Sequence, residues 1–192
     1  VTTDNVAANY NAVINPSTLF ESRFTGTRDN EPGAANSNSP EAQIRQAGTL
    51  VLQIGRNNFS PRYTNARTFQ FVEILSHQHG NHDYRFGMDL NIQRLDNFFP
   101  GNFGGSFQFN SYADFANRTP AAFTQGFAGA GTDGPLTHPN VTESAFYVQD
   151  SWRVIDRLTL NYGIRYDLFT YANPTVKNPD PGLAAIGIDT SR

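Results

Sequence analysis

Residues 158–168 read LTLNYGIRYDL, and this stretch decides the fold because its side chains alternate strictly in character. Leu, Tyr and Ile occupy the even positions, whereas Thr, Asn, Gly, Arg and Asp occupy the odd ones. A β-strand sends successive side chains to opposite faces, so the pattern predicts a strand with one apolar face and one polar face. A helix would instead distribute both sets around its circumference.

The same alternation appears at residues 83–93 and, with one exception, at residues 143–153. Each stretch is about 11 residues long, which suits a tilted strand that crosses a bilayer core. The exception is Asp150, on the apolar side, where a carboxylate near the membrane rim costs only about 0–1 kcal/mol. Weaker alternation predicts three more strands, at 6–14, 20–28 and 68–77. The strand at 68–77 has apolar residues at both odd and even positions, so its two faces stay unassigned.

Short turns are predicted within each pair of strands, and long stretches rich in Gly, Asn, Pro and Ser are predicted between the pairs. The turns lie at 15–18, 78–81 and 154–157. The resulting hairpins cover about 6–28, 67–95 and 141–171. The long loops cover about 29–66, 96–140 and 172–192. Outer-membrane barrels show this asymmetry, with tight periplasmic turns and long extracellular loops.

Two segments inside the long loops are predicted to have local structure. TLVLQI at 49–54 suits a short strand, and SYADFAN at 111–117 suits a helical turn with Ser111 as its N-cap.

Composition excludes several classes of protein. The net charge of −3 and the 16% of charged residues argue against a nucleic-acid-binding surface. The absence of cysteine rules out disulfides and thiolate chemistry. The sequence contains no run of about 18 apolar residues, so no transmembrane helix is predicted. Aromatic residues make up 13% although the mean hydropathy is −0.48, as expected for strands that alternate aromatic and polar residues.

These patterns predict an all-β chain: an antiparallel meander of about six long strands that forms part of a large transmembrane β-barrel in the bacterial outer membrane. Six strands cannot close a small barrel, which needs about eight, so we expect a segment of a longer protein. The apolar faces should meet lipid, and the polar faces should line the lumen. The predicted lumen-facing residues are Arg85, Asp89, Asn91, Gln93, Asn161, Arg165 and Asp167.

The alternative is a soluble β-sandwich or jelly roll that binds carbohydrate or another ligand. In that fold the apolar face would pack against a second sheet, whereas in a barrel segment taken alone it would be exposed.

Two groups of residues in or near the loops are candidate binding sites. Three imidazoles near a turn, His77, His79 and His82, can be a metal site or simply a polar turn. The second group is a series of aromatic residues: Phe98, Phe99, Phe103, Phe107 and Tyr112. These side chains can form a ligand platform at the barrel mouth, or they can form the packed core of a loop together with an aromatic girdle at the membrane interface.

Other motifs predict no chemistry. The glycine-rich stretch at 101–105 lacks the lysine and the context of a phosphate loop, and the loop carboxylates Asp29, Glu31 and Asp133 match no EF-hand spacing. We therefore predict no catalytic residue, no cofactor and no enzymatic activity.

Two longer stretches resemble a known family. ESAFYVQDSWRVIDRLTLNYGIRYDLF at 143–169 is similar to a barrel hairpin of TonB-dependent receptors. HGNHDYRFGMDLNIQRLDNFFPGNFGGSFQFNSYADF at 79–115 resembles another hairpin and loop of that family, nearest to the Oar-like receptors that carry a carboxypeptidase-regulatory-like domain. The resemblance extends from about Tyr10 to Phe169.

The resemblance implies a barrel of about twenty-two strands around a plug domain. It also implies uptake, or export, of an unknown substrate, energised by the TonB complex. The implied partners are outer-membrane lipid, the rest of the barrel and the plug, and TonB through regions outside this sequence, which contains neither a plug nor a TonB box. No nucleic-acid partner is expected.

Overall fold

The structure is a computed structural model, and it describes residues 1–174 and 181–188. The chain forms two compact units, which are described separately. The strand unit comprises residues 1–30, 65–95 and 139–172, and the loop unit comprises the remaining segments, 31–64, 96–138 and 173–192. Within the described residues, no helix is long and apolar enough to span a membrane.

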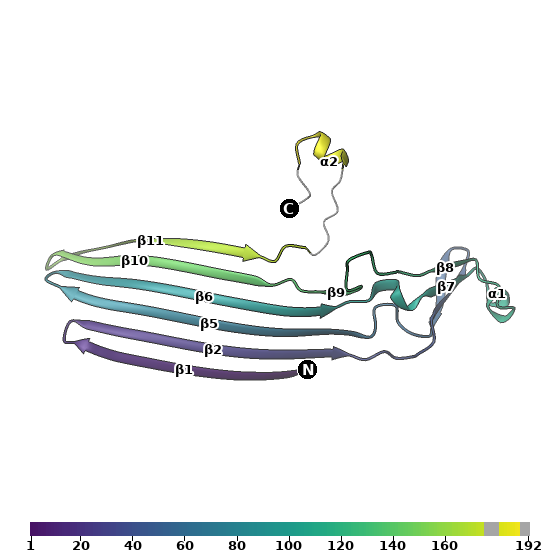
Figure 1. Cartoon of the computed structure of the whole chain (residues 1–192), viewed down its shortest axis with the longest axis horizontal. Coiled ribbons are helices and arrows are strands. Elements are labelled where there is room, and N and C mark those ends of the chain that lie inside the picture. The colour runs from purple at the N-terminus through teal and green to yellow at the C-terminus, as the bar shows by residue number, and fades with distance from the viewer. Residues whose placement is uncertain (175–180, 189–192) are drawn as a thin grey trace. The chain divides into compact units, whose positions relative to one another are not determined.

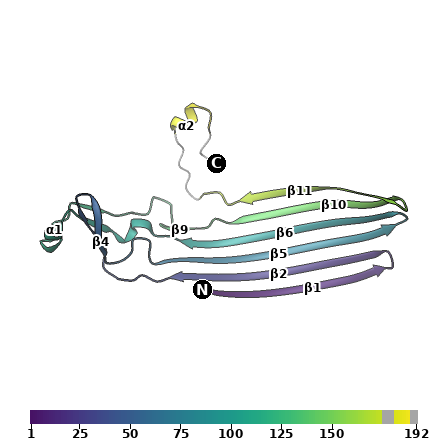
Figure 2. The same ribbon diagram turned by 180° about the vertical axis from the view of Figure 1, so that it is seen from behind.

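Six long strands form one sheet in the order β1-β2-β5-β6-β10-β11 (Figures 1 and 2). Their bounds are β1 Thr2–Asn15, β2 Thr18–Gly33, β5 Arg62–His79, β6 His82–Phe98, β10 Val141–Ile155 and β11 Leu158–Tyr171. Each long strand lies beside the long strand that follows it along the chain. The pairs β1–β2, β6–β10 and β10–β11 are antiparallel. The predicted all-β antiparallel meander is confirmed.

Two-residue turns close the three hairpins at 16–17, 80–81 and 156–157. Gly80 has a φ of +59°, a conformation that glycine adopts without steric cost. The strands have 14 to 18 residues and so extend beyond the predicted 11-residue segments. Pairing continues to Thr2 opposite Asn30 and to Val141 opposite Tyr171. Backbone hydrogen bonds sustain the ladder there without apolar alternation, which is why the pattern underestimated the strand lengths.

The register puts the apolar residues of neighbouring strands on one side of the sheet, because directly opposed residues share a face. Phe86 lies opposite Val148, which lies opposite Ile164; Met88 likewise meets Phe146, which meets Tyr166. We call this side the apolar face and the other side the polar face. The apolar face thus includes the alternating sets of the two best predicted strands: Tyr84, Phe86, Met88, Leu90 and Ile92 of β6 and Leu160, Tyr162, Ile164, Tyr166 and Leu168 of β11.

Contacts of β5 assign the faces that sequence left open. The Phe71 ring packs on Phe24 of β2 with centroids 5.0 Å apart, and Ser22 Oγ donates to Glu73 Oε1 at 2.9 Å. Odd-numbered residues of β5 therefore share the apolar face with even-numbered residues of β2. Gln70 contacts Asp89 on the other side, so Val72 and Ile74 belong to the polar face.

The sheet is open in the described part of the chain, because β1 and β11 form its two edges. The apolar face is also solvent-exposed: Ile164 has an exposed fraction of 72%, Tyr166 of 64% and Phe146 of 52%. A soluble sandwich would bury these side chains against a second sheet. The exposure therefore favours the barrel segment over the sandwich.

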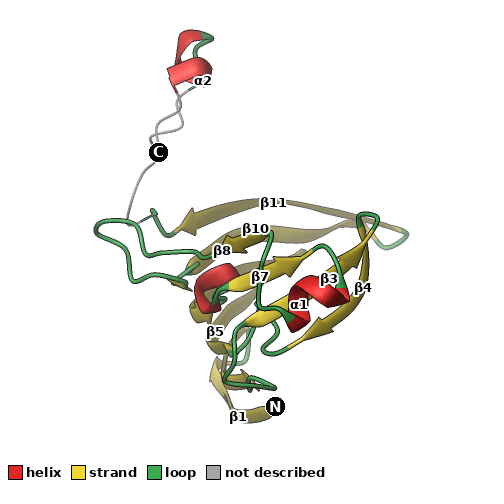
Figure 3. Cartoon of the chain, turned by 90° about the vertical axis from the view of Figure 1, so that its right-hand side faces the viewer, coloured by secondary structure: helices red, strands yellow, loops and turns green. Residues whose placement is uncertain are grey.

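The loop unit contains a small sheet of its own in the order β4-β3-β7-β8, with bounds β3 Glu41–Gln46, β4 Thr49–Ile54, β7 Ser106–Phe109 and β8 Ala122–Thr124 (Figure 3). Ile44 of β3 is completely buried and Phe109 nearly so. The helix α1, Tyr112–Ala116, has Ser111 as its N-cap, with the hydroxyl accepting from the Asp114 N–H. The predicted strand at 49–54 and helical turn at 111–117 are thus both confirmed. The remaining elements are η1 Gly101–Gly104, β9 Leu136–Thr137 and α2 Pro181–Ala185.

Candidate functional site: the polar face and the loop unit

The polar face gathers all seven residues that the sequence predicted to line a lumen. Strand register places Asp89 opposite Ala145, which lies opposite Asp167; Arg165 lies one step along, opposite Tyr147. The other predicted residues occupy the same face by the two-residue period of a strand: Arg85, Asn91 and Gln93 on β6 and Asn161 on β11.

Hydrogen bonds connect polar side chains along this face. Gln70 Nε2 donates to Asp89 Oδ1 at 3.0 Å, and Arg165 Nε donates to Asp167 Oδ1 at 2.9 Å. A shallow cavity of about 160 Å³ lies among these residues, and Glu143 and Asn91 also line it. Amides, carboxylates and a guanidinium around a small open cavity form a surface that water wets well, as expected for a barrel lumen.

Asp150 is the one carboxylate of β10 on the apolar face, and it is satisfied by neighbouring strands. Its Oδ2 accepts from the Tyr162 hydroxyl at 2.6 Å and lies 2.7 Å from His82 Nδ1. The side chain is buried, with an exposed fraction of 5% for the residue. Rings stack beside it, with His82 5.4 Å from Tyr84 and from Trp152. This polar group therefore joins β6, β10 and β11 close to the short turns.

The three histidines do not assemble into a metal centre. His77 Nδ1 lies 2.9 Å from the Thr18 hydroxyl, and its ring stacks on His79 with centroids 6.3 Å apart. His82 is engaged by Asp150 instead. Over residues 1–174 and 181–188, no three metal-binding side chains come together. The polar-turn interpretation therefore fits the geometry better than the metal-site interpretation.

A buried glutamate organises the loop unit. Glu41 begins β3 and has an exposed fraction of 1%. Its carboxylate accepts from Gln53 Nε2 at 2.9 Å, from the Asn58 backbone N–H at 3.0 Å and from Ser106 Oγ at 3.1 Å, and the Gln43 amide is a further donor. Because Ser106 belongs to the second long loop, this one carboxylate ties the two long loops together.

The predicted aromatic platform is divided among several contacts. Phe98 stacks on Tyr63 at 5.2 Å, whereas Phe107 packs on Phe123 at 4.5 Å within the small sheet. Tyr112 is about half exposed on α1. The structure therefore does not bring the predicted rings together on one surface, and Phe107 and Phe98 are engaged in packing. Phe103, also in the loop unit, lies against Gly126.

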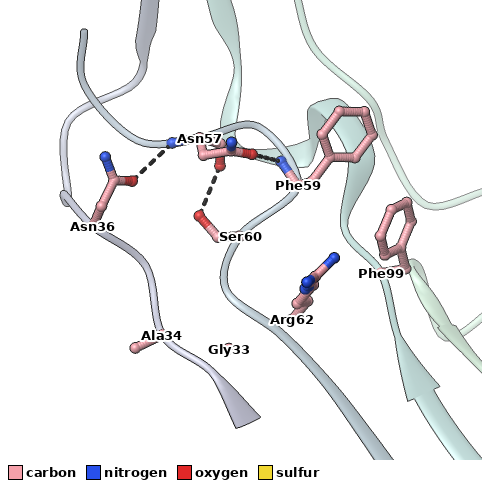
Figure 4. A pocket seen from close by; sticks show the side chains of 8 residues that line it. All are labelled: Gly33, Ala34, Asn36, Asn57, Phe59, Ser60, Arg62 and Phe99. Atoms are coloured by element: carbon pink, nitrogen blue, oxygen red, sulfur yellow. Dashed lines mark hydrogen bonds between the residues drawn. The ribbon is translucent and has the colours of Figure 1, made fainter. Parts of the chain in front are cut away.

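Phe99 contributes instead to a hollow that no sequence pattern predicts. Its ring pairs with Phe59 at a centroid distance of 5.3 Å. Figure 4 shows these rings with Arg62, Asn36, Asn57 and Ser60. Together with Gly33 and Ala34, these residues line an open cavity of about 570 Å³. The lining residues come from two long loops, and no local pattern in the sequence joins them.

An exposed apolar face, a polar face and long loops define the wall of an outer-membrane β-barrel. The chain belongs to the family described as outer membrane beta barrel domain, whose model matches residues 1–182. It is also 28% identical over 165 residues to the "TonB-dependent transporter Oar" of Myxococcus xanthus. The aligned region covers 79% of this chain but only 15% of that protein. No solved structure matches the chain. The location that follows is the bacterial outer membrane.

Proposed function

We propose that this chain is part of the barrel wall and extracellular loops of a TonB-dependent transporter of the Oar-like group. The amphipathic open sheet carries the proposal. Lipid cannot satisfy the free backbone groups of a sheet edge, so a membrane sheet must close on itself. Strands from outside residues 1–192 would then complete the barrel between β1 and β11. The named relative, of which this chain spans about 15%, supports the transport role.

In this proposal each part of the chain has a separate task. The apolar face contacts lipid, and the polar face lines a lumen that holds a plug. The lumen-facing residues are Arg85, Asp89, Asn91, Gln93, Asn161, Arg165 and Asp167. The loop unit makes the first contact with the transported substrate. The role is non-enzymatic and needs no cofactor, because energy reaches the barrel through TonB.

Binding of TonB by the full-length protein tests the energy-coupling part of the proposal. The purified receptor in detergent would be mixed with the periplasmic domain of TonB and analysed by pull-down. We expect retention of the receptor, and loss of retention when the segment that contacts TonB is deleted from the receptor. A correctly assembled barrel that never binds TonB would contradict TonB dependence while leaving the outer-membrane location intact.

A further inference from the structure

We propose that the hollow between Phe59, Arg62 and Phe99 is a substrate-contact site that binds a carboxylate attached to a body with an apolar surface. This inference deepens the proposed transport function and rests on it. Arg62 would bind the carboxylate, and the two rings would contact the body of the ligand. We call this place the Arg62 hollow; its lining residues are those shown in Figure 4.

Arg62 is the one charged side chain that lines the Arg62 hollow. Its guanidinium is exposed and forms no hydrogen bond or ion pair with any residue in 1–174 or 181–188. Glu31 stands two residues before Gly33 on β2 but does not line the Arg62 hollow. A guanidinium presents several N–H groups in a planar fork that matches a carboxylate, so this unpaired cation is suited to bind one.

The polar neighbours of Arg62 are fixed in position by the loop itself. Asn36 Oδ1 accepts from the Asn57 N–H at 2.9 Å, and Asn57 Oδ1 accepts from the Phe59 N–H at 2.9 Å. Ser60 Oγ donates to the Asn57 carbonyl oxygen at 2.9 Å, as Figure 4 shows. The Asn36 amide nitrogen donates to the Gly55 carbonyl oxygen at 2.9 Å, whereas the Asn57 amide N–H₂ has no acceptor among the described residues. The Asn57 amide and the Arg62 guanidinium therefore offer donors to an anionic ligand, while the Ser60 hydroxyl, whose hydrogen is already donated, can only accept.

The aromatic pair supplies the apolar part of the Arg62 hollow. Phe59 and Phe99 have exposed fractions of 47% and 46%, although their rings already contact each other. Exposed rings with a preformed mutual orientation can bury the apolar side of a ligand at little entropic cost. A ligand with both an anionic group and a ring or hydrocarbon surface would use both parts of the hollow.

Gly33 leaves room for the stem of Arg62. A Cβ at this position would lie 2.8 Å from Arg62 Cγ and 3.2 Å from the Arg62 carbonyl oxygen. The first contact is too close for a real side chain, and the second is with backbone that cannot move away easily. Glycine therefore lets the stem of Arg62 lie along the neighbouring strand, and any larger residue would displace it.

Binding to the full-length receptor in detergent tests the proposal. The probes would be trigalacturonate and acetyl-Gly-Gly-Phe, which carry a carboxylate on a sugar and on a peptide, with α-1,4-galactotriose and acetyl-Gly-Gly-Phe-amide as their neutral counterparts. Calorimetric titration should show that one acid binds and its neutral counterpart does not. Which acid binds distinguishes an acidic sugar from a peptide terminus as the source of the carboxylate.

Arg62→Met should then weaken binding of that acid about tenfold or more, because a hydrogen-bonded charge contact is lost. Phe59→Ala should weaken it as well, and added salt should reduce binding by the wild type far more than by Arg62→Met. Arg118→Asn is the matched control: it removes an exposed arginine of the same unit, and asparagine tolerates the positive φ of 57° found there. We expect it to bind like the wild type.

Several results would overturn the proposal. These are equal binding of an acid and its neutral counterpart, no binding of either acid, or the same loss in Arg62→Met and Arg118→Asn. Each variant would first be checked for folded-barrel migration on gels, and Arg62→Lys gives a second, conservative variant should Arg62→Met fail to assemble. Ligand binding by the receptor in detergent requires no energy coupling. Absence of ligand binding would therefore leave the TonB proposal standing, and absence of TonB binding would leave the proposal for the Arg62 hollow standing.

Discussion

The ring of Tyr147 covers Gly87, its cross-strand partner on the polar face, so closely that a Cβ at position 87 would overlap ring atoms of the tyrosine. The glycine exposes a stretch of backbone on β6, and the aromatic ring of β10 shields it. Such aromatic cover of a strand glycine fixes register, because a shift by one residue would move the ring to the other face.

Gly87→Val should therefore destabilise the barrel. A side chain at position 87 must displace the ring of Tyr147, and overpacking of this kind costs about 1–3 kcal/mol. We expect a lower midpoint in urea unfolding of the full-length receptor, monitored by tryptophan fluorescence. Gly129→Ala is the control, because a Cβ there meets only Thr132 at an ordinary 3.6 Å. An unchanged midpoint in Gly87→Val would mean that the ring does not occupy this position.

Charge on the apolar face should impair membrane assembly. Leu90→Arg and Ile164→Arg each place a cation among residues proposed to contact lipid, at a cost of about 2–4 kcal/mol near the bilayer midplane. Asn91→Arg changes the neighbouring polar face and should assemble almost normally. Heat-modifiable migration of the outer-membrane fraction on gels reports assembly. Equal yields of folded barrel from the two classes of variant would remove the basis for the face assignment.

Loss of the Glu41 carboxylate should loosen the loop unit while leaving the strand unit folded. Four donors converge on this buried group, and each would be left without its acceptor in Glu41→Ala; an unsatisfied buried group costs about 1–3 kcal/mol. We expect limited proteolysis to cut between 41 and 58 at least several times faster, with folded-barrel migration unchanged. A cleavage rate equal to that of the wild type would show that the carboxylate does not hold the loops together.

Asp150 and Tyr162 should be energetically coupled. The Tyr162 hydroxyl donates to the buried Asp150 carboxylate at 2.6 Å, and side chains joined in one hydrogen-bond network are usually coupled. A double-mutant cycle with Asp150→Ala and Tyr162→Phe, measured by urea unfolding, should give a coupling energy of about 0.5–3 kcal/mol. Strictly additive effects would show that the two side chains are independent.

Sequence determined most of the strand unit because one physical rule, alternation across a strand, acts locally. The apolar and polar sets of β6 and β11 lie on opposite faces of the sheet, as alternation predicts, and Asp150 lies on the apolar face. On β5, alternation failed because Val72 and Ile74 lie on the polar face while Glu73 lies on the apolar face next to Ser22. Only the register with β2 resolves that strand, and register is a property of two segments distant in sequence.

The loop unit was less predictable because its interactions are non-local. The sequence shows aromatic residues in these loops, but their packing partners, such as Tyr63 for Phe98 and Phe123 for Phe107, lie elsewhere in the loops. Glu41 and Arg62 looked like ordinary polar loop residues. Nothing local distinguishes a glutamate that accepts four hydrogen bonds from one that faces solvent.

Cysteine scanning along β6 can establish which face of the sheet meets lipid, since the chain has no cysteine of its own. Single cysteines at positions 85, 86 and 88–92 of the full-length receptor, freed of any other cysteine, would be reacted in intact outer membranes with a water-soluble maleimide. If the apolar face meets lipid and the polar face lines the lumen, labelling should alternate: fast at 85, 89 and 91, and slow at 86, 88, 90 and 92. Uniform labelling, or the opposite alternation, would contradict the assignment of the apolar face to lipid and the polar face to the lumen.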